Sequence, residues 1–153
     1  MTIDAKAIFA AVTSHAQALG VFDKVNGHEP KSAPASGLIC SFWVEVLRPI
    51  PPRSGLASTS ALLVLSARVQ TTMLAEPADD IDPRILSATD ALMIAYTGDF
   101  DLSGQVAKVD LLGAFWPAGL NARAGYLNQD SKLFRVMVVD IPLVINDAWS
   151  QSV

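Results

Sequence analysis

The clearest pattern in the chain is a helical one over residues 82–98. We expect Asp82 to cap the first turn, because its carboxylate can accept from a free N–H, and Pro83 to occupy the first helical position. Gly98 is expected to end the helix in a left-handed conformation. The residues that recur at spacings of three and four are Ile85, Leu86, Thr89, Leu92, Met93 and Tyr96. Such an apolar stripe predicts a helix that packs on one layer of structure.

A second helix is predicted near Asp4–Leu19, where Gly20 supplies an end signal. Its apolar positions at helical spacing are Ile8, Phe9, Val12, Ala16 and Leu19. Val21–Val25 is expected to form a short strand, and the polar, turn-rich residues of Asn26–Ser36 a loop.

The first long strand is predicted over Leu38–Arg48, where side chains alternate in character. Strict alternation places one wholly apolar set on the core face: Leu38, Cys40, Phe42, Val44 and Val46. A second strand is expected over Ala61–Leu74, with Arg68 on its outer face. The proline-rich segment of residues 49–55 interrupts strand pairing, so the two strands should form a long antiparallel hairpin with a projecting tip.

Three more strand patterns follow the central helix, over residues 106–113, 120–127 and 132–143. The last is apolar on both faces, which indicates that both faces are covered. Helices would cover one face, and we expect a neighbouring subunit to cover the other. The fold class predicted for the single domain of residues 1–153 is α+β: two helices packed on one face of a mainly antiparallel sheet.

Composition narrows the range of functions. Of the 153 residues, 51% are hydrophobic and only 17% are charged, which favours a protein with surface covered by other protein. A net charge of −4 does not favour wrapping of nucleic acid. The single Cys40 excludes an internal disulfide. Neither a secretion signal nor an apolar run long enough for a bilayer is present, so we expect a soluble, cytoplasmic protein.

Residue types that carry catalysis or metal binding do not form a recognisable pattern. His28 beside Glu29 gives too few ligands for zinc, and Asp79, Asp80 and Asp82 lack the glycine and distal glutamate of a calcium loop; these five residues stand in turn-rich sequence. Asp99 and Asp101 are paired carboxylates with no base or pocket to position them. We therefore predict no catalytic, metal or cofactor site, and no enzymatic activity.

The order of several short motifs resembles one known family. The motifs are His28-Glu-Pro-Lys31 with Gly37-Leu38, Trp43-Val44, Arg48-Pro49, Ser54-Gly-Leu56, Arg68-Val69, Glu76-Pro-Ala-Asp-Asp-Ile-Asp82, Gly98-Asp-Phe100, Val109-Asp110-Leu111, Ala124-Gly-Tyr-Leu127 and Phe134-Arg135-Val136. Over about Phe22–Trp149 the chain is similar to the tail-terminator proteins of long-tailed (siphovirus) bacteriophages that infect actinobacteria.

The resemblance implies a virion structural protein that caps the head-proximal end of the tail. In that family six copies form a homo-hexameric ring, which stops polymerisation of the major tail tube protein and presents a joining surface to the head–tail connector or stopper protein. DNA passes through the ring without specific binding, and assembly takes place in the host cytoplasm. No cofactor, membrane or catalytic residue is implied.

Two alternatives remain open at this point. One is another neck or tail-completion protein of similar size. The other is a small ligand-binding protein or enzyme, in which the curved sheet encloses an apolar pocket with Asp110 or Asp99 as its polar group.

A subunit interface is predicted at the outer face and tip of the hairpin. Ile50, set between prolines, should be a stiff and exposed apolar projection, and proline lowers the entropy lost on docking. Arg53 and Arg68 would pair with acidic residues of the next subunit such as Asp79 or Asp99. The full predicted interface is Trp43, Glu45, Arg48, Ile50, Pro52, Arg53 and Arg68.

Overall fold

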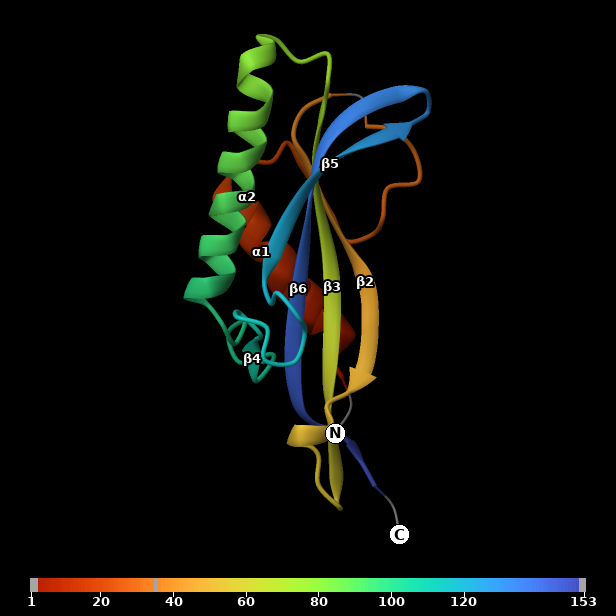
Figure 1. Ribbon diagram of the computed structural model, residues 1–153, viewed down its shortest axis with the longest axis vertical. Coiled ribbons are helices and arrows are strands. Elements are labelled where there is room, and N and C mark those ends of the chain that lie inside the picture. The colour runs from red at the N-terminus through yellow and green to blue at the C-terminus, as the bar shows by residue number, and fades with distance from the viewer. Residues whose placement is uncertain (1–2, 35, 152–153) are drawn as a thin grey trace.

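Two helices pack on one face of a six-stranded, mainly antiparallel sheet in the computed structural model, which describes residues 3–34 and 36–151 (Figure 1). The predicted α+β fold class is therefore confirmed. The helices are α1 (Ala5–Leu19) and α2 (Ile81–Gly98), with the short 3-10 helices η1 (Pro51–Arg53) and η2 (Ala78–Asp80). The strands are β1 (Lys24–Asn26), β2 (Ile39–Pro49), β3 (Ser58–Thr72), β4 (Lys108–Val109), β5 (Asn121–Gln129) and β6 (Lys132–Ser150).

The sheet is built around the long central strands β3 and β6. Strands β2, β3 and β6 pair antiparallel in that order, and β1 joins the outer edge of β2 in parallel. Strands β4 and β5 both pair with the other edge of β6. The predicted hairpin of the first two long strands is confirmed, and its tip lies at one end of the long axis (Figure 1). The connection from β3 to α2 lies at the other end.

Helix α1 begins and ends as predicted. Asp4 is the N-cap and its carboxylate accepts from the N–H of Ala7 at 3.1 Å. Gly20 ends the helix at φ 69°, in the left-handed region that glycine adopts without steric cost. Three of its predicted apolar positions, Ile8, Val12 and Ala16, are buried against the sheet.

Helix α2 is also found where it was predicted, but its ends are made differently. It begins at Ile81, and Asp82 lies inside the first turn, where its carboxylate accepts from Arg135 at 2.9 Å instead of capping the helix. The cap residue at the far end is Asp99 at φ −120°, so Gly98 does not supply a left-handed end. The buried face keeps Ile85 but not Leu86, because Ala88 completes the stripe on the sheet side.

A β-bulge in β2 makes the predicted core face wrong at its far end. The register of β2 on β3 shifts between Val44 and Val46, so side chains after the bulge point to opposite faces from those expected. Leu38, Cys40 and Phe42 are buried as predicted. Val44 comes before the shift and pairs with Leu65, so it keeps the predicted direction, but it is 53% exposed. Val46 packs instead in a second cluster on the face away from the helices.

That second face of the sheet is covered largely by the chain itself, so the apolar residues of β6 do not require the neighbouring subunit that the sequence suggested. On β6, Phe134, Val136 and Val144 are all buried. The loop before β2 reaches across this region, since the carbonyl of Pro30 accepts from the side chain of Gln129 at 3.2 Å. Any contact with a neighbouring subunit must therefore use the exposed surface of the molecule.

Candidate assembly surface

The hairpin tip has a small apolar core of its own. Ile50 is only 3% exposed and packs with Leu62, Val64 and Val144. The turn is closed by the Ser54 hydroxyl, which donates to the carbonyl of Ile50 at 2.7 Å. The prediction that Ile50 projects from the tip is wrong: the chain folds back over it, so the interface must use other tip residues.

The loop of residues 110–119, which follows β4, packs against this tip. The buried carboxylate of Asp110 accepts from the N–H groups of Ala114, Phe115 and Trp116, each at 2.8 Å. Gly119 closes the loop at φ 62°, where a Cβ would collide with the carbonyl of Leu111. Three charge-assisted hydrogen bonds to one carboxylate hold the loop in a single conformation.

Three cations surround the aromatic rings that this loop presents. The Arg48 guanidinium lies 5.4 Å from the Trp116 ring centroid and donates to the carbonyl of Phe115 at 2.9 Å. Arg53 and Lys108 lie 5.8 Å and 5.4 Å from the Phe115 centroid. We call Arg48, Arg53 and Lys108 the basic tip cluster. Cation–π contacts fix the positions of these charges without neutralising them.

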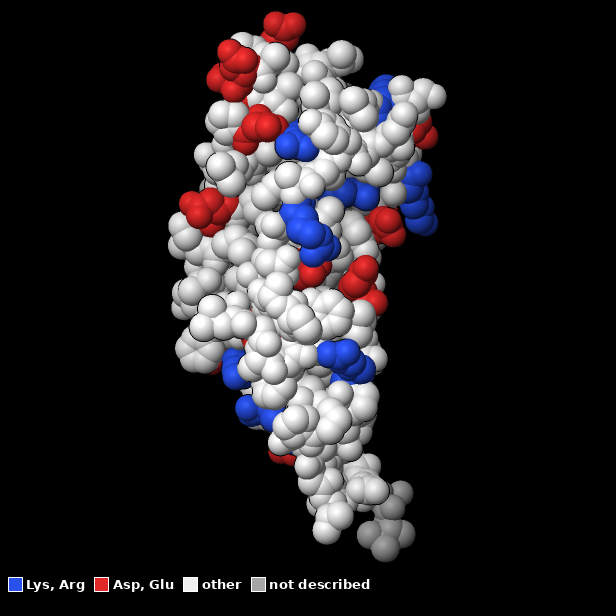
Figure 2. Space-filling model, in the orientation of Figure 1, with Lys and Arg blue, Asp and Glu red and all other residues white. Residues whose placement is uncertain are grey.

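The outermost part of the tip is apolar and exposed. Leu56 is 96% exposed, and Pro52 is also exposed on η1. Figure 2 shows that the lower end of this face carries few charged side chains, in contrast to its upper part. Such a patch at one end of an elongated molecule is suited to contact with another protein.

The other predicted interface residues lie along β2 and β3. Glu45 is exposed at the bulge and Trp43 is half-buried. Arg68 is only 9% exposed: its guanidinium lies 5.2 Å from the Trp43 ring centroid, and its Nε donates to Gln70 at 3.0 Å. Burial lowers the pKa of Arg68, with Glu29 opposing that shift. The prediction that Arg68 faces out for pairing with another subunit is therefore wrong.

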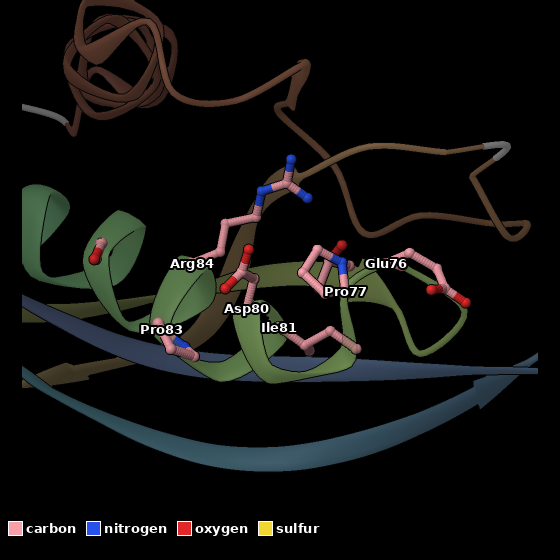
Figure 3. A pocket seen from close by; sticks show the side chains of 9 residues that line it. Glu76, Pro77, Asp80, Ile81, Pro83 and Arg84 are labelled. Atoms are coloured by element: carbon pink, nitrogen blue, oxygen red, sulfur yellow. The ribbon is translucent and has the colours of Figure 1, made fainter.

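The opposite end of the molecule is acidic. Glu76, Asp79 and Asp80 are exposed on the connection from β3 to α2, and we call these three residues the acidic end. Figure 2 shows acidic side chains gathered over the upper part of α2. A hollow of about 390 Å³ opens between this connection and the start of α2, lined by Glu76, Asp80, Arg84 and Thr71 among others (Figure 3).

One polar group in this hollow has no partner. Thr71 is 1% exposed, and its hydroxyl makes no hydrogen bond with any described residue. Figure 3 shows that the side chains of Asp80 and Arg84 extend from the turn that starts α2. The side chain of Glu76 extends from the connection before that turn. The border of the hollow therefore carries the Asp80 carboxylate and the Arg84 guanidinium, while the Thr71 hydroxyl is buried.

Asp99 is positioned against a base, which the sequence did not reveal. His15 Nε2 on α1 lies 2.7 Å from Oδ2 of Asp99, the residue after α2, although the two residues are 84 positions apart in the sequence. The backbone N–H of Ser103 also donates to Asp99 at 2.9 Å. These hydrogen bonds lower the pKa of Asp99, and the bond from the Ser103 backbone has the largest effect. The Ser103 hydroxyl donates to Asp99 and not to His15, so the trio lacks the order of a nucleophilic triad.

This arrangement makes Asp99 unavailable for the predicted pairing with another subunit, whereas Asp79 remains exposed. Within residues 3–34 and 36–151, no three His, Cys, Asp or Glu side chains group as a metal site would require. Neither α1 nor α2 has the length and hydropathy needed to span a membrane. Cys40 is buried, as predicted for a core side chain.

The sequence did not identify Phe115, Trp116, Lys108 and Asn146 as parts of the tip. Asn146 accepts from Arg53 at 3.0 Å, and Phe115 accepts from Arg48 across 67 residues of sequence. The adjacent aromatic residues Phe115 and Trp116 in a turn-rich segment were the one sign of this site in the sequence, because large aromatic side chains usually pack against a partner.

Comparison with known proteins does not identify a family: no family model matches the chain, and no curated protein is significantly similar to it.

Proposed function

We propose that this chain is a tail-terminator-type structural protein, which assembles as a ring at the head-proximal end of a bacteriophage tail. In this role it stops polymerisation of the tail tube and presents the joining surface for the head connector. It acts through protein contacts rather than catalysis, and DNA passes through the ring without specific binding.

One observation carries the proposal: two segments with the family's motifs occupy opposite ends of the long axis (Figure 1). Ser54-Gly-Leu56 belongs to the hairpin tip, and residues 76–82 form the connection at the other end. A terminator must contact the tube on one side and the connector on the other. Placement of the motif residues at both ends of an elongated subunit fits that requirement.

The construction of the tip supports the same role. Its own apolar core around Ile50 and the loop held by Asp110 make it rigid before any partner binds. A surface that is already ordered loses less conformational entropy on docking. Each end also exposes a leucine, Leu56 at the tip and Leu74 beyond β3, at 96% and 85% exposure.

The rival function, a ligand binder with a buried carboxylate, has less support. Asp110 is buried, but both its oxygens accept from backbone N–H groups of its own loop. Asp99 is shared between His15 and Ser103. These two carboxylates stabilise the fold, so neither is free to bind a ligand. Another neck or tail-completion protein remains the nearer alternative, and the experiment below separates it from a terminator.

The test is polymerisation of the tail tube protein from the same genome, with and without the purified chain. A terminator should form closed rings on tube ends and arrest growth when added, which negative-stain electron microscopy and light scattering measure. Another neck protein would bind without arresting growth. A genome without a tail tube protein, or tubes that lengthen normally in the presence of the chain, would refute the proposal.

Leu56→Asp with Pro52→Asp should abolish arrest while leaving the melting temperature nearly unchanged, because both side chains are exposed. Ile94→Asp is the control, since it introduces the same charge on an exposed aliphatic side chain in the second half of α2, away from both ends (Figure 1). Ile50→Asp is not an interface test, because it places a charge inside the tip core and would unfold it.

A further inference from the structure

A groove of about 430 Å³ opens at the hairpin tip between η1 and the loop of residues 110–119. Its lining is mainly apolar and includes Pro49, Pro51, Pro52, Ala114 and Phe115, with Arg48 as the charged member. Both walls are rigid, because proline fixes its own backbone angle and the Asp110 carboxylate holds the loop through three backbone N–H groups. The groove therefore exists before any partner binds, and we call it the tip groove.

The cations beside the tip groove have no counterion. Within residues 3–34 and 36–151, no carboxylate forms a salt bridge with the basic tip cluster. A guanidinium carries several N–H donors, and Arg48 uses one of them on the Phe115 carbonyl, so donors remain for a partner. The whole chain has a net charge of −4, so this cluster is a local reversal of sign that attracts an acidic group.

Exposed aliphatic side chains accompany these cations. Leu56 lies in the turn between η1 and β3, and Leu112 lies in the loop of residues 110–119; each is 96% exposed. Aliphatic surface of this kind is stabilised when a partner covers it. The tip therefore favours a partner that brings apolar side chains together with carboxylates.

We infer that the tip groove binds an acidic segment of the tail tube protein. An aliphatic side chain of that segment fills the groove, and carboxylates beside it accept hydrogen bonds from Arg48, Arg53 and Lys108. This inference rests on the proposed function and deepens it, because it states the chemistry by which the tip recognises the tube.

DNA fits the same site less well. The rings of Phe115 and Trp116 are already engaged by cations, so they are not open platforms for stacked bases. The apolar lining of the groove also gives no advantage to a phosphate backbone, which is bound through charge alone. Charge and apolar surface together match a protein segment better than a nucleic acid.

Charge reversal at the tip tests this contact. Arg53→Glu with Lys108→Glu should weaken binding of the chain to the purified tube protein by about tenfold or more, because attraction becomes repulsion. Arg53→Lys with Lys108→Arg should retain binding, because both positive charges remain. Surface plasmon resonance measures the affinities, and circular dichroism should show that all variants are folded.

Lys31→Glu with Lys132→Glu is the matched control, because it makes the same change of net charge at exposed positions. These lysines lie in the loop before β2 and at the start of β6, at the opposite end of the long axis from the tip (Figure 1). The control should bind the tube protein as the native chain does. Raising the salt concentration should weaken native binding, because exposed ion pairs are screened.

Overlapping peptides that cover the tube protein sequence identify the segment that is bound. The peptides that bind the native chain should contain Asp or Glu beside Leu, Ile or Phe, and replacing their carboxylates by amides should remove binding. Double-stranded DNA of mixed sequence and light scattering of the chain alone test the other two occupants, nucleic acid and a second copy.

The outcomes separate the inference from the function it rests on. If the native chain arrests tube growth and the reversed variant binds the tube equally well, the groove contact is wrong while the proposed function stands. Bound peptides without acidic residues, or a reversal that removes DNA binding or self-association instead of tube binding, also overturn the inference. Tube binding that is lost on reversal, without arrest by the native chain, keeps the inference and refutes the terminator role. If the native chain neither binds nor arrests the tube, both fail together.

Discussion

Replacing Asp110 with asparagine should loosen the tip while leaving the rest of the fold in place. The aspartate accepts three backbone hydrogen bonds at 2.8 Å, one on Oδ1 and two on Oδ2. Asparagine keeps one acceptor oxygen and turns an NH₂ group toward the other donors, so one or two bonds are lost and the charge with them. A hydrogen bond to a charged group contributes about 1.5–3 kcal/mol, and water partly replaces the lost bonds because the donor residues of the loop are partly exposed, so we expect a loss of about 2–4 kcal/mol.

Urea denaturation followed by tryptophan fluorescence measures this loss, and Trp116 in the loop is one of the reporters. With a denaturant slope of about 2 kcal/mol per molar urea, the unfolding midpoint should fall by about 1–2 M. Asp90→Asn is the matched control on the exposed face of α2 and should change the free energy of unfolding by less than about 0.5 kcal/mol. A shift for Asp110→Asn no larger than that of the control would refute the claim that this carboxylate holds the loop.

Three further predictions concern the core and its titratable groups. Phe42→Ala should cost about 3–5 kcal/mol, because its ring is fully buried, whereas Val44→Ala should cost less than about 1 kcal/mol, because its side chain is exposed; equal midpoints in urea for the two variants would contradict this difference in burial. Burial raises the pKa of the Cys40 thiol, so a thiol reagent at mildly alkaline pH should react with it only when denaturant unfolds the chain, and rapid native labelling would contradict its burial. The pKa of Asp99 is lowered from its ordinary value of 3.8, so its contribution to stability is full above that pH and is lost as the pH falls through the lower, folded-state pKa. Asp99→Asn should therefore flatten the acid side of the stability profile, and melting curves that stay parallel to the native ones below pH 3.8 would argue against this.

The local elements could be predicted because their signals are local. The 3.6-residue period identified both helices, and the cap residues Asp4 and Gly20 gave the ends of α1 correctly, since a cap acts only on the turn beside it. The alternation along β3 also predicted a strand there, although its pairing with β2 shifts between Val44 and Val46 and its pairing with β6 shifts between Thr59 and Ala61. The prediction for Asp82 failed because its carboxylate can either cap a helix or pair with a cation. Its partner Arg135 belongs to β6, which is far away in the sequence.

The proline-rich tip was predicted in place, but its packing was not. The sequence by itself determined that a proline-rich tip follows β2 and that Arg48 and Arg53 flank it. Only the tertiary structure decided that Ile50 turns inward, that Arg68 stacks on Trp43, and which residues complete the tip. Burial depends on which distant segments pack against a residue, and a bulge reverses side-chain direction without any change in composition. The period of a pattern fixes the type of an element, whereas the face that meets solvent is set by contacts between segments far apart in the chain.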